Sequence, residues 1–498
     1  MKEKPTALSR SNRLFFQRVH RAAFSNPFGS ERQTLDREIY PGAPAHSPDA
    51  LLEGVLAAVA SRLASALPDR AQWKRFVAPD RDCLRTALLF DLFHRYCDRF
   101  DDLVLRQQSA GDEPVPCPFV GKVLAELLTF GFSAAEAADS ASLFYQLRRA
   151  YFLIEQGLVG RSRPMRELRL RLWQCVFTGD TQRYATHLWN RMEDFSTLLL
   201  GETGTGKGAA AAAIGRSGLI PYDAKRQRFA HSFTAMFTPI NLSQYPESLI
   251  ESELFGHRKG AFTGAVGDSE GVLARTRPHG VLFLDEIGEA SPRVQIKLLH
   301  VLQDRQFTPV GSRERRRFHG RVVAATNRTL ADWRRNGGLR EDFYYRLSSA
   351  TIAMPSLRER LRDAPDERRL LLGRIVERLL GHAAPDVADS IESALAKSLP
   401  PDYAWPGNVR ELEQAARRIL LDGAYTPEFD AGSGGNLPRL ETGIADGRLT
   451  AHELLSLYCA RLHERLGSFE SVARRAELDR RTAKKYADAG RHMDRGEE

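Results

Sequence analysis

The sequence predicts a multidomain protein with an all-α N-terminal domain, a central α/β domain built on a parallel sheet, and a C-terminal helix–turn–helix. Between about 50 and 157, apolar residues recur at three- and four-residue spacing, as in "ALLEGVLAAVASRLASAL". From about 158 on, short apolar runs such as "STLLLG", "GVLFLDE" and "RVVAAT" alternate with helical stretches. That alternation is typical of a parallel sheet covered by helices.

Five segments follow from these patterns. Residues 1–50 are polar, with Pro and Ser, and we expect them to be weakly ordered, although they belong to the first segment. The stretch "TPEFDAGSGGNLPRLETG" is rich in Gly, Pro and Ser, which is typical of a linker. The predicted segments are a helical N-terminal domain at 1–157, an α/β domain at 158–355, a helical lid at 356–425, a linker at 426–447 and a helix–turn–helix at 448–498.

Composition narrows the class of protein. The chain has 498 residues, 42% of them hydrophobic and 27% charged, and a net charge of +9. This basicity is compatible with nucleic-acid binding, but basic faces are often only solvated. The five cysteines are scattered, without a CxxC pair, which argues against a disulfide framework or a zinc site. We see no signal peptide and no apolar run of about 18 residues, so we expect a cytoplasmic protein that does not enter membranes.

A glycine-rich turn follows the first strand-like run. "GETGTGKG" fits the pattern G-x-x-G-x-G-K and precedes the helical stretch "GAAAAAIGR". Backbone N–H groups of such a loop cradle phosphates, and its lysine reaches the terminal phosphates. A purely structural turn is the alternative. The predicted nucleotide-binding residues are Gly201, Glu202, Thr203, Gly204, Thr205, Gly206, Lys207 and Gly208.

Polar residues follow two further strand-like runs. Adjacent acids at a buried strand end, Asp285 and Glu286, are costly unless a cation or water uses them. Asp285 is the predicted ligand of Mg²⁺, directly or through water, and Glu286 would orient and deprotonate an attacking water. Asn327 follows the next run, where its amide could position water; asparagine is also common in turns.

Two arginines flank an aromatic stretch in "GGLREDFYYRLS". Arg340 and Arg346 could stabilise the negative charge that develops during phosphoryl transfer. A solvated pair on a helix is the alternative.

These pieces, in this order, resemble the AAA+ P-loop ATPase module of the bacterial enhancer-binding proteins, the activators of sigma-54 RNA polymerase. The decisive stretch is "ESELFGHRKGAFTGA", which matches that family's GAFTGA loop. Two glycines flank an aromatic residue and a threonine, which suits a mobile tip with a transient protein contact. The resemblance covers about 158–425 and implies sigma-factor contact by Gly260, Ala261, Phe262, Thr263, Gly264 and Ala265.

The resemblance also implies roles for single residues. Asp285 and Glu286 would be the Walker B pair, Asn327 sensor I, and Arg340 and Arg346 the arginine fingers. "WPGNVRELE" resembles the sensor II motif, in which Arg410 senses the nucleotide, and Asn241 in "TPINLS" matches the asparagine that pairs with the catalytic glutamate. Because arginine fingers complete a neighbour's site, the resemblance implies a hexameric ring.

The sequence departs from the family in two respects. Gly208 stands where the family has Glu, which slightly lowers the helix preference of that turn; we expect nucleotide binding to survive, with Mg²⁺ held by phosphates, water and Asp285. Two stretches, at 178–195 and 218–237, are longer than in the family, and their effect on ring geometry stays open.

The last helical piece predicts a DNA-binding domain. We expect Leu454, Tyr458, Leu462 and Leu466 to form the apolar face of its first helix, and Gly467 to end that helix. Ser468 and Asp479 are predicted N-caps of the next two helices. The third helix, which resembles the recognition helix of the factor-for-inversion-stimulation type, carries the predicted DNA contacts Arg480, Arg481, Thr482, Lys484 and Lys485. A basic hairpin that only packs on the ring is the alternative.

The function that the sequence predicts is ATP-dependent activation of transcription. The protein would bind double-stranded DNA upstream of a promoter, use ATP and Mg²⁺, and remodel the sigma-54 RNA polymerase holoenzyme. A DNA-binding regulator whose ring is a passive nucleotide-binding scaffold is one alternative, and a general protein-remodelling ATPase is another. The sequence identifies neither the target promoters nor the signal that the N-terminal domain receives.

Overall fold

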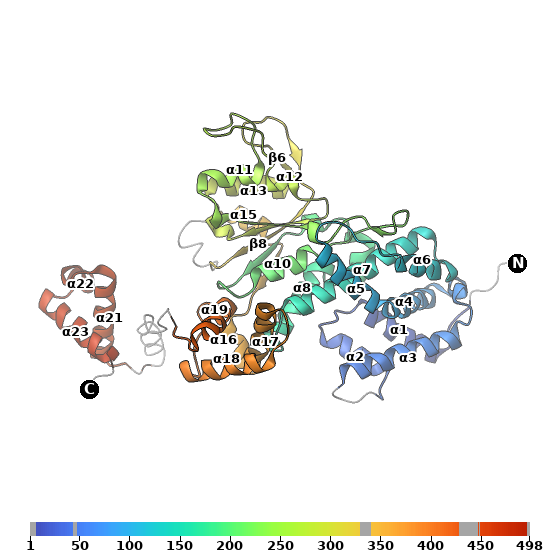
Figure 1. Cartoon of the computed structure of the whole chain (residues 1–498), viewed down its shortest axis with the longest axis horizontal. Coiled ribbons are helices and arrows are strands. Elements are labelled where there is room, and N and C mark those ends of the chain that lie inside the picture. Colours follow the sequence, from blue (N-terminus) through green and yellow to red (C-terminus); the bar gives the residue numbers. More distant parts are fainter. Residues whose placement is uncertain (1–5, 43–46, 329–339, 428–446, 448, 496–498) are drawn as a thin grey trace. The chain divides into compact units, whose positions relative to one another are not determined.

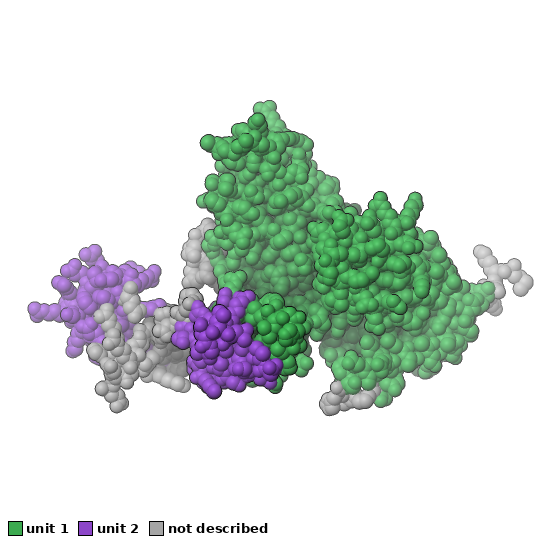
Figure 2. Space-filling view, viewed as in Figure 1, with its two compact units in different colours: residues 1–385, 407–413 green, residues 386–406, 414–498 purple. Residues whose placement is uncertain are grey.

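The computed structural model describes residues 6–42, 47–328, 340–427, 447 and 449–495. The chain divides into two compact units, one of residues 1–385 and 407–413 and one of residues 386–406 and 414–498 (Figure 2). Most of the predicted linker at 426–447 lies outside the described residues. No helix in the described ranges combines the length and the apolarity needed to cross a membrane. All five cysteines are free thiols, as the sequence predicts.

The N-terminal part of the first unit is helical, as predicted (Figure 1). Residues 1–50 were expected to be weakly ordered, and that expectation is wrong for the two helices that begin the chain. The first of them buries Phe15, Phe16 and Val19 on one face, while its other face is polar. The average composition of residues 1–50 does not reveal this apolar face, because polar residues on the other face of the helix outnumber the apolar ones. The helices are α1 (Arg10–Phe24), α2 (Ser30–Ile39), α3 (Pro48–Ala66), the 3₁₀ helix η1 (Arg70–Arg75), α4 (Ala78–Arg95), α5 (Cys97–Ala110), α6 (Phe119–Thr129) and α7 (Ala134–Gly157).

A five-stranded parallel sheet forms the centre of the first unit. Its strand order is β4-β5-β8-β1-β9, and every neighbouring pair is parallel. Every residue of β8 is buried, as expected for a central strand covered on both faces. The strands are β1 (Thr197–Leu200), β4 (Phe237–Asn241), β5 (Val281–Asp285), β8 (Arg321–Thr326) and β9 (Ala350–Ala353).

Helices connect and cover these strands, as the alternating pattern predicts (Figure 1). They are α8 (Arg163–Phe177), α10 (Lys207–Gly215), α11 (Glu247–Phe255), α12 (Val272–Arg275), α13 (Pro292–Asp304) and α15 (Glu341–Leu347). Single 3₁₀ turns lie at η4 (Thr234–Met236), η5 (Leu242–Gln244) and η6 (Ile287–Glu289). A small hairpin, β6 (Gln306–Phe307) with β7 (Arg316–Arg317), lies between α13 and β8.

The N-terminal helices and the sheet share a core. Ala150 and Ile154 of α7 belong to the same buried cluster as Ala210 and Ile214 of α10. Helix α7 therefore packs directly against the helix that follows the glycine-rich loop (Figure 1). The two regions are continuous within one compact unit.

Both stretches that are long for the family contact the N-terminal helices. The first contains α9 (Thr181–Arg183), the π-helical turn η2 (Tyr184–Leu188) and η3 (Met192–Asp194), and the Gln146 amide of α7 donates to the Tyr184 hydroxyl over 2.6 Å. The second forms a hairpin of β2 (Tyr222–Asp223) and β3 (Arg228–Phe229), whose Tyr222 and Phe229 join the core of the N-terminal helices. These stretches thus attach the helical region to the sheet.

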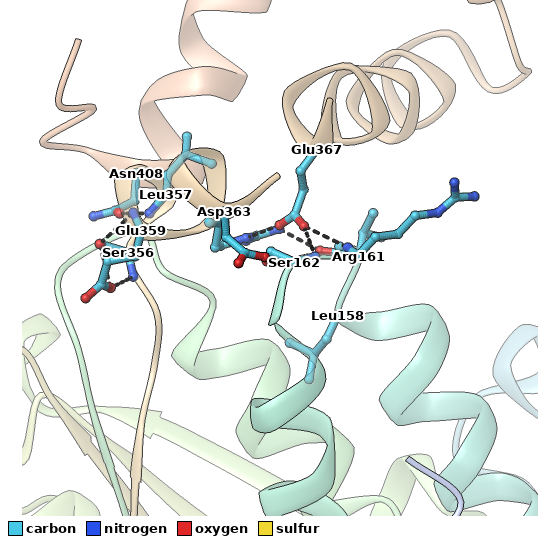
Figure 3. Close-up of polar contacts among 12 residues, drawn as sticks. Leu158, Arg161, Ser162, Ser356, Leu357, Glu359, Asp363, Glu367 and Asn408 are labelled. Atoms are coloured by element: carbon cyan, nitrogen blue, oxygen red, sulfur yellow. Dashed lines mark hydrogen bonds and ion pairs between the residues drawn. The ribbon is translucent and has the colours of Figure 1, made fainter. Parts of the chain in front are cut away.

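The predicted lid is helical. Helices α16 (Leu357–Asp363) and α17 (Glu367–Leu380) belong to the first unit, together with the start of α19 (Asn408–Asp422). Helix α16 begins with a capping box between Ser356 and Glu359 (Figure 3). In the second unit, α18 (Pro385–Ser398) buries Ala388, Ile391 and Leu395 along one face.

The C-terminal piece folds as three helices, α21 (Ala451–Leu466), α22 (Phe469–Ala476) and α23 (Arg480–Arg495). The predicted caps are confirmed: Gly467 ends α21, the Ser468 hydroxyl accepts from the Ser471 N–H, and the Asp479 carboxylate accepts from the Arg481 and Thr482 N–H groups. The predicted apolar face of α21 is wrong. Its buried residues are Ser456, Leu457, Cys459 and Ala460, whereas Leu454, Tyr458 and Leu466 are exposed; only Leu462 of the predicted set packs on the core.

Candidate functional site

The glycine-rich loop connects β1 to α10, in the strand–loop–helix arrangement that the sequence predicts. Gly204 and Gly206 have φ angles of +81° and +95°, a region that favours glycine. A Cβ on Gly204 would lie 2.1 Å from the Gly407 carbonyl oxygen, so a side chain cannot fit there. A Cβ on Gly208 would meet nothing within 4 Å, so this glycine is not required by packing.

Lys207 lies at the bottom of this loop and is 7% exposed. Its ammonium group donates to the carbonyl oxygens of Gly201, over 2.8 Å, and Glu202, over 3.1 Å. Burial lowers the pKa of Lys207, and the nearby carboxylates of Glu286 and Asp285 oppose that shift. The loop thus holds one cation between backbone groups and two acids.

The two acids lie where the sequence predicts them, at the carboxyl end of β5. Asp285 pairs in register with Asn241, the last residue of the neighbouring strand β4. Glu286 follows with φ +52°, an uncommon conformation for a residue with a side chain. Burial raises the pKa of Glu286, and the charge of Asp285 adds to the rise, although Lys207 opposes it. A carboxyl with a raised pKa in a polar pocket is suited to accept a proton.

Asn241 differs from what the resemblance implies. Its amide nitrogen lies 3.5 Å from a carboxylate oxygen of Asp285, and its amide oxygen accepts from the N–H and hydroxyl of Ser243. Among the hydrogen bonds of the described residues, the implied pair between Asn241 and Glu286 is not formed. Asn327 is brought to the site: its amide nitrogen lies 3.5 Å from the Thr203 hydroxyl of the loop, and its backbone hydrogen-bonds Glu286.

The start of α19 lies against the loop. The Val409 N–H donates to the Gly204 carbonyl over 3.1 Å, and the Asn408 amide donates to the Thr203 carbonyl over 3.0 Å and to a Glu202 carboxylate oxygen over 3.1 Å. The Asn408 amide oxygen accepts from the Leu357 N–H (Figure 3). The sequence identified the motif around Asn408 but not this side chain, whose contacts depend on how the chain folds back.

A pocket of about 530 Å³ opens beside the loop. Its lining includes five residues that the sequence predicts for the site: Lys207, Asn241, Asp285, Glu286 and Arg410. The positive charge of Arg410 contributes to lowering the pKa of Lys207. The sequence patterns did not identify five apolar residues that also line the pocket and that we call its apolar end: Leu158, Val159, Met165, Leu371 and Ile375. Arg360, Arg374, Arg378 and Glu413 line the pocket as well. The only local signal was the apolar pair before the glycine in "LVGRS". A polar end with a cation and an apolar end fit a ligand that carries phosphates and a planar base.

The two predicted finger arginines lie outside this pocket. Arg340 is exposed and pairs with Asp342 over 2.8 Å, and Arg346 is exposed on α15. Neither is among the described residues that line the pocket of their own chain.

The GAFTGA sequence occupies the tip of the connection between α11 and α12. His257 and Ser269 exchange two backbone hydrogen bonds, of 3.0 and 2.9 Å, and the Gly260 N–H donates to the Ala265 carbonyl over 2.9 Å. Phe262 is 37% exposed, beside the His257 ring, and Thr263 is also exposed. The loop therefore presents an aromatic and a hydroxyl side chain to solvent.

The base of this loop is tightly built. A Cβ on Gly271 would lie 2.3 Å from the Gly256 nitrogen, so the two ends of the loop touch. Arg258 pairs with Asp268 over 2.6 Å and with Glu314 over 2.8 Å, which ties the loop to the neighbouring connection between β6 and β7. The tip is exposed while its base is held.

The predicted DNA contacts lie on one helix of the second unit. Arg480, Arg481, Lys484 and Lys485 of α23 are exposed, and Thr482 is half-buried. Ala483 and Ala487 of the same helix are buried against α21 and α22. The charged side chains thus lie on the outer face.

Comparisons with known proteins agree with this geometry. Residues 181–353 match the family model of the Sigma-54 interaction domain, and the match ends at the last residue of β9. A Nif-specific regulatory protein of Azotobacter vinelandii is 40% identical over 294 residues, which are 58% of this chain and 50% of that protein. The C4-dicarboxylate transport transcriptional regulatory protein DctD of Rhizobium meliloti (strain 1021) is 37% identical over 333 residues, 64% of this chain and 65% of that protein.

Among solved structures, NtrX from Brucella abortus in complex with ADP aligns with 72% of this chain and 75% of its own, at 23% identity and a TM-score of 0.40. This chain spans between half and about two thirds of the length of the two curated relatives. Within that span, the α/β domain with its pocket and its GAFTGA loop matches the Sigma-54 interaction domain, and the chain is similar there to transcriptional regulatory proteins that carry it.

Proposed function

We propose that this protein is an ATP-dependent activator of transcription that binds DNA upstream of a promoter and remodels the sigma-54 RNA polymerase holoenzyme. One observation carries the proposal above all others: the GAFTGA tip and the phosphate-type loop belong to one domain, and the tip lies within the connection between β4 and β5. These are the strands that carry Asn241 and Asp285 at their carboxyl ends. The chain that forms the GAFTGA loop thus joins the two strands whose carboxyl ends line the nucleotide pocket.

The pocket supports ATP as the ligand. Lys207 and the N-terminal end of α10 offer positive charge to phosphates, and the apolar end offers surface to a base. Hydrolysis is phosphoryl transfer to water, in which Glu286 would orient the water and accept its proton. The raised pKa of Glu286 supports this role.

The donor set also fits Mg²⁺. Among the described residues, no group of three or more His, Cys, Asp or Glu side chains gathers as a metal cage. Magnesium is usually held by one or two carboxylates together with substrate phosphates and water, so Asp285 beside a triphosphate is sufficient. Bound Mg²⁺ would neutralise charge on the phosphates. Gly208 supplies no hydroxyl, and Asp285 would be the protein's ligand.

Coupling to the contact loop would run through β4 and α11. Asn241 senses the acids at the pocket through Asp285, and the chain from Asn241 leads through η5 and α11 to the loop. A change in charge at the pocket would alter the Asn241 contact and thereby the position of Thr263 and Phe262. We infer a hexameric ring in which Arg340 and Arg346 complete the neighbour's site, because both are exposed and outside their own pocket.

The experiment is a comparison of ATP hydrolysis with promoter opening. Purified protein, sigma-54 holoenzyme and a promoter with an upstream site are assayed for phosphate release and open complexes. Lys207→Ala should lose both activities. Thr263→Glu should hydrolyse ATP within about twofold of wild type yet form no open complexes, because the exposed tip makes no contact with the pocket. Open complexes formed by Thr263→Glu at the wild-type rate would refute the proposal.

A further inference from the structure

The segment 158–162, "LVGRS", links α7 to α8 and has no helix or strand of its own. Charged side chains bind its backbone instead. Arg169 donates to the carbonyl oxygens of Leu158, over 2.8 Å, and Gly160, over 2.5 Å, and Arg360 donates to the Val159 carbonyl over 2.6 Å. The position of this segment therefore depends on side chains from α8 and α16.

Glu367 is the acceptor at the other side of the segment (Figure 3). Its carboxylate accepts from the N–H groups of Arg161, over 2.7 Å, and Ser162, over 2.6 Å, and from Arg360 over 2.5 Å. The Glu367 side chain is 0% exposed, and that of Arg360 is 4% exposed. A buried carboxylate with three donors is satisfied, but its removal would leave a cation and two backbone N–H groups buried without an acceptor.

The fit around this carboxylate is close. Gly160 has a φ of +150°, and a Cβ there would lie 2.6 Å from a Glu367 carboxylate oxygen. The segment can approach Glu367 only because this position is glycine.

Glu367 is also the first residue of α17, a helix that contributes other residues to the pocket lining. Leu371 and Ile375 follow one and two helical turns later, on the same face, and both line the pocket. Leu158 and Val159, on the segment that Glu367 holds, also line it. One carboxylate therefore connects the two chain segments, 158–162 and α17, that supply apolar wall residues.

We propose that Glu367, with Arg360, is a positioning residue that sets the width of the base-binding end of the nucleotide site. The inference rests on the proposed function, since it takes the apolar end as the site of the base. Glu367 does not touch the phosphate end, whose lining residues are on the loop and on β5. Its loss should therefore weaken recognition of the base and leave recognition of the phosphates intact.

The test compares ligands with and without a base, using the full-length chain. Binding is measured by titration with a fluorescent ADP analogue and by its displacement with ATP and with inorganic tripolyphosphate. In Glu367→Gln we expect ATP and ADP to bind about tenfold more weakly or worse, because buried donors lose a charged acceptor. Tripolyphosphate should displace the analogue with an unchanged inhibition constant, and KM for ATP should rise far more than kcat falls.

Matched variants separate positioning from loss of stability. Asp101→Asn breaks a half-buried pair with Arg148, of 2.6 Å, neither of which lines the pocket, and should lower the melting temperature without changing either affinity. Arg360→Lys keeps the charge but cannot bridge Glu367 and Val159, so it should show the same selective loss, and it provides the test if Glu367→Gln does not fold. Because Arg360 itself lines the pocket and Glu367 does not, Glu367→Gln is the variant that separates positioning from direct contact.

Two results would overturn the inference. Equal weakening of ATP and tripolyphosphate would mean that Glu367 acts on the whole domain, and unchanged ATP affinity in both Glu367→Gln and Arg360→Lys would mean that the pair does not position the wall. Failure of the wild-type chain to bind any of these ligands would instead refute the proposed function itself.

Discussion

Arg149, on the last helix of the N-terminal region, donates through Nε to the Arg216 carbonyl oxygen, over 2.8 Å, at the carboxyl end of the helix that follows the phosphate-type loop. A second nitrogen of the same guanidinium donates to the Gly218 carbonyl. Arg149 is fully buried and lies over the Tyr145 ring. A cation at this end of α10 complements the helix dipole. The N-terminal helices therefore stabilise α10, the helix whose first residue is Lys207.

We predict that Arg149→Ala destabilises the first unit by about 1–3 kcal/mol, the range for leaving buried carbonyl acceptors without a donor. Equilibrium unfolding in denaturant, with nucleotide binding followed in parallel, measures this effect. Arg148→Ala is the control, since its half-buried pair with Asp101 does not touch α10 and should cost about 1 kcal/mol or less.

By the same reasoning, removal of residues 1–157 should yield aggregated protein, because Ala210 and Ile214 would lose their cover. A soluble truncated protein that binds ATP would show that α10 does not need the packing of the N-terminal helices.

We predict that Gly208→Ala stabilises the protein by about 0.5–1 kcal/mol and preserves nucleotide binding. A Cβ there meets nothing within 4 Å, and Gly208 lies in the first turn of α10. Gly204→Ala is the matched change on the same loop and should abolish binding, since its Cβ would lie 2.1 Å from the Gly407 carbonyl oxygen. Thermal melts and nucleotide titrations distinguish the two. Equal behaviour of both variants would contradict the close approach of Gly204 to the Gly407 carbonyl oxygen.

The pH dependence of hydrolysis should reflect Glu286. Burial and the charge of Asp285 raise the pKa of Glu286, and a protonated carboxyl cannot accept a proton from water. We therefore expect kcat to fall with decreasing pH at a point above the ordinary glutamate value of about 4.3. Rates measured between pH 5 and 8 at saturating ATP check this. Glu289→Gln removes another charge that raises the pKa of Glu286, so it should move the profile toward lower pH.

The same shift has a consequence for stability. A raised folded-state pKa means that the folded protein holds this proton more tightly than the unfolded chain does. The stability that Glu286 contributes is thus fully present below the unfolded pKa and is lost as pH rises through the raised folded pKa. Glu286→Gln should therefore melt higher than wild type at pH 7.5 while losing hydrolysis, and the difference should vanish near the ordinary pKa of about 4.3. A lower melting temperature at pH 7.5 would contradict this account.

We predict that the double variant Arg481→Ala, Lys484→Ala weakens binding to upstream DNA and leaves ATP hydrolysis intact. Both side chains are exposed on α23, and each lost phosphate contact should lower the salt slope of binding by about 1. Gel shifts at several salt concentrations give that slope. The control removes an equal charge from the β2–β3 turn with Lys225→Ala and Arg226→Ala, which are exposed. Equal losses in both double variants would mean that net charge, and not this helix, governs binding.

Sequence patterns placed the loops in the fold correctly where one short stretch defines them. The phosphate-type loop and the acids at the end of β5 follow from short contiguous patterns, and the GAFTGA tip, which the resemblance to a family identified, is contiguous as well. Sequence patterns failed where they had to identify the buried face of a helix, as in α21. Leu454, Tyr458, Leu462 and Leu466 are spaced by four residues, and that spacing drifts by about 40° at each step around a helix of 3.6 residues per turn. Over three steps the drift is about 120°, so the ends of this row cannot share one buried face.

Only the tertiary structure decided which distant charges meet. Arg149 reaches Arg216, and Glu367 reaches Arg161 and Arg360, across segments that are remote or unremarkable in the sequence. A phosphate-binding loop is specified by its own backbone conformation, which a few glycines encode locally. A buried ion pair depends instead on how whole helices pack, and packing is a property of the folded chain that no single stretch contains.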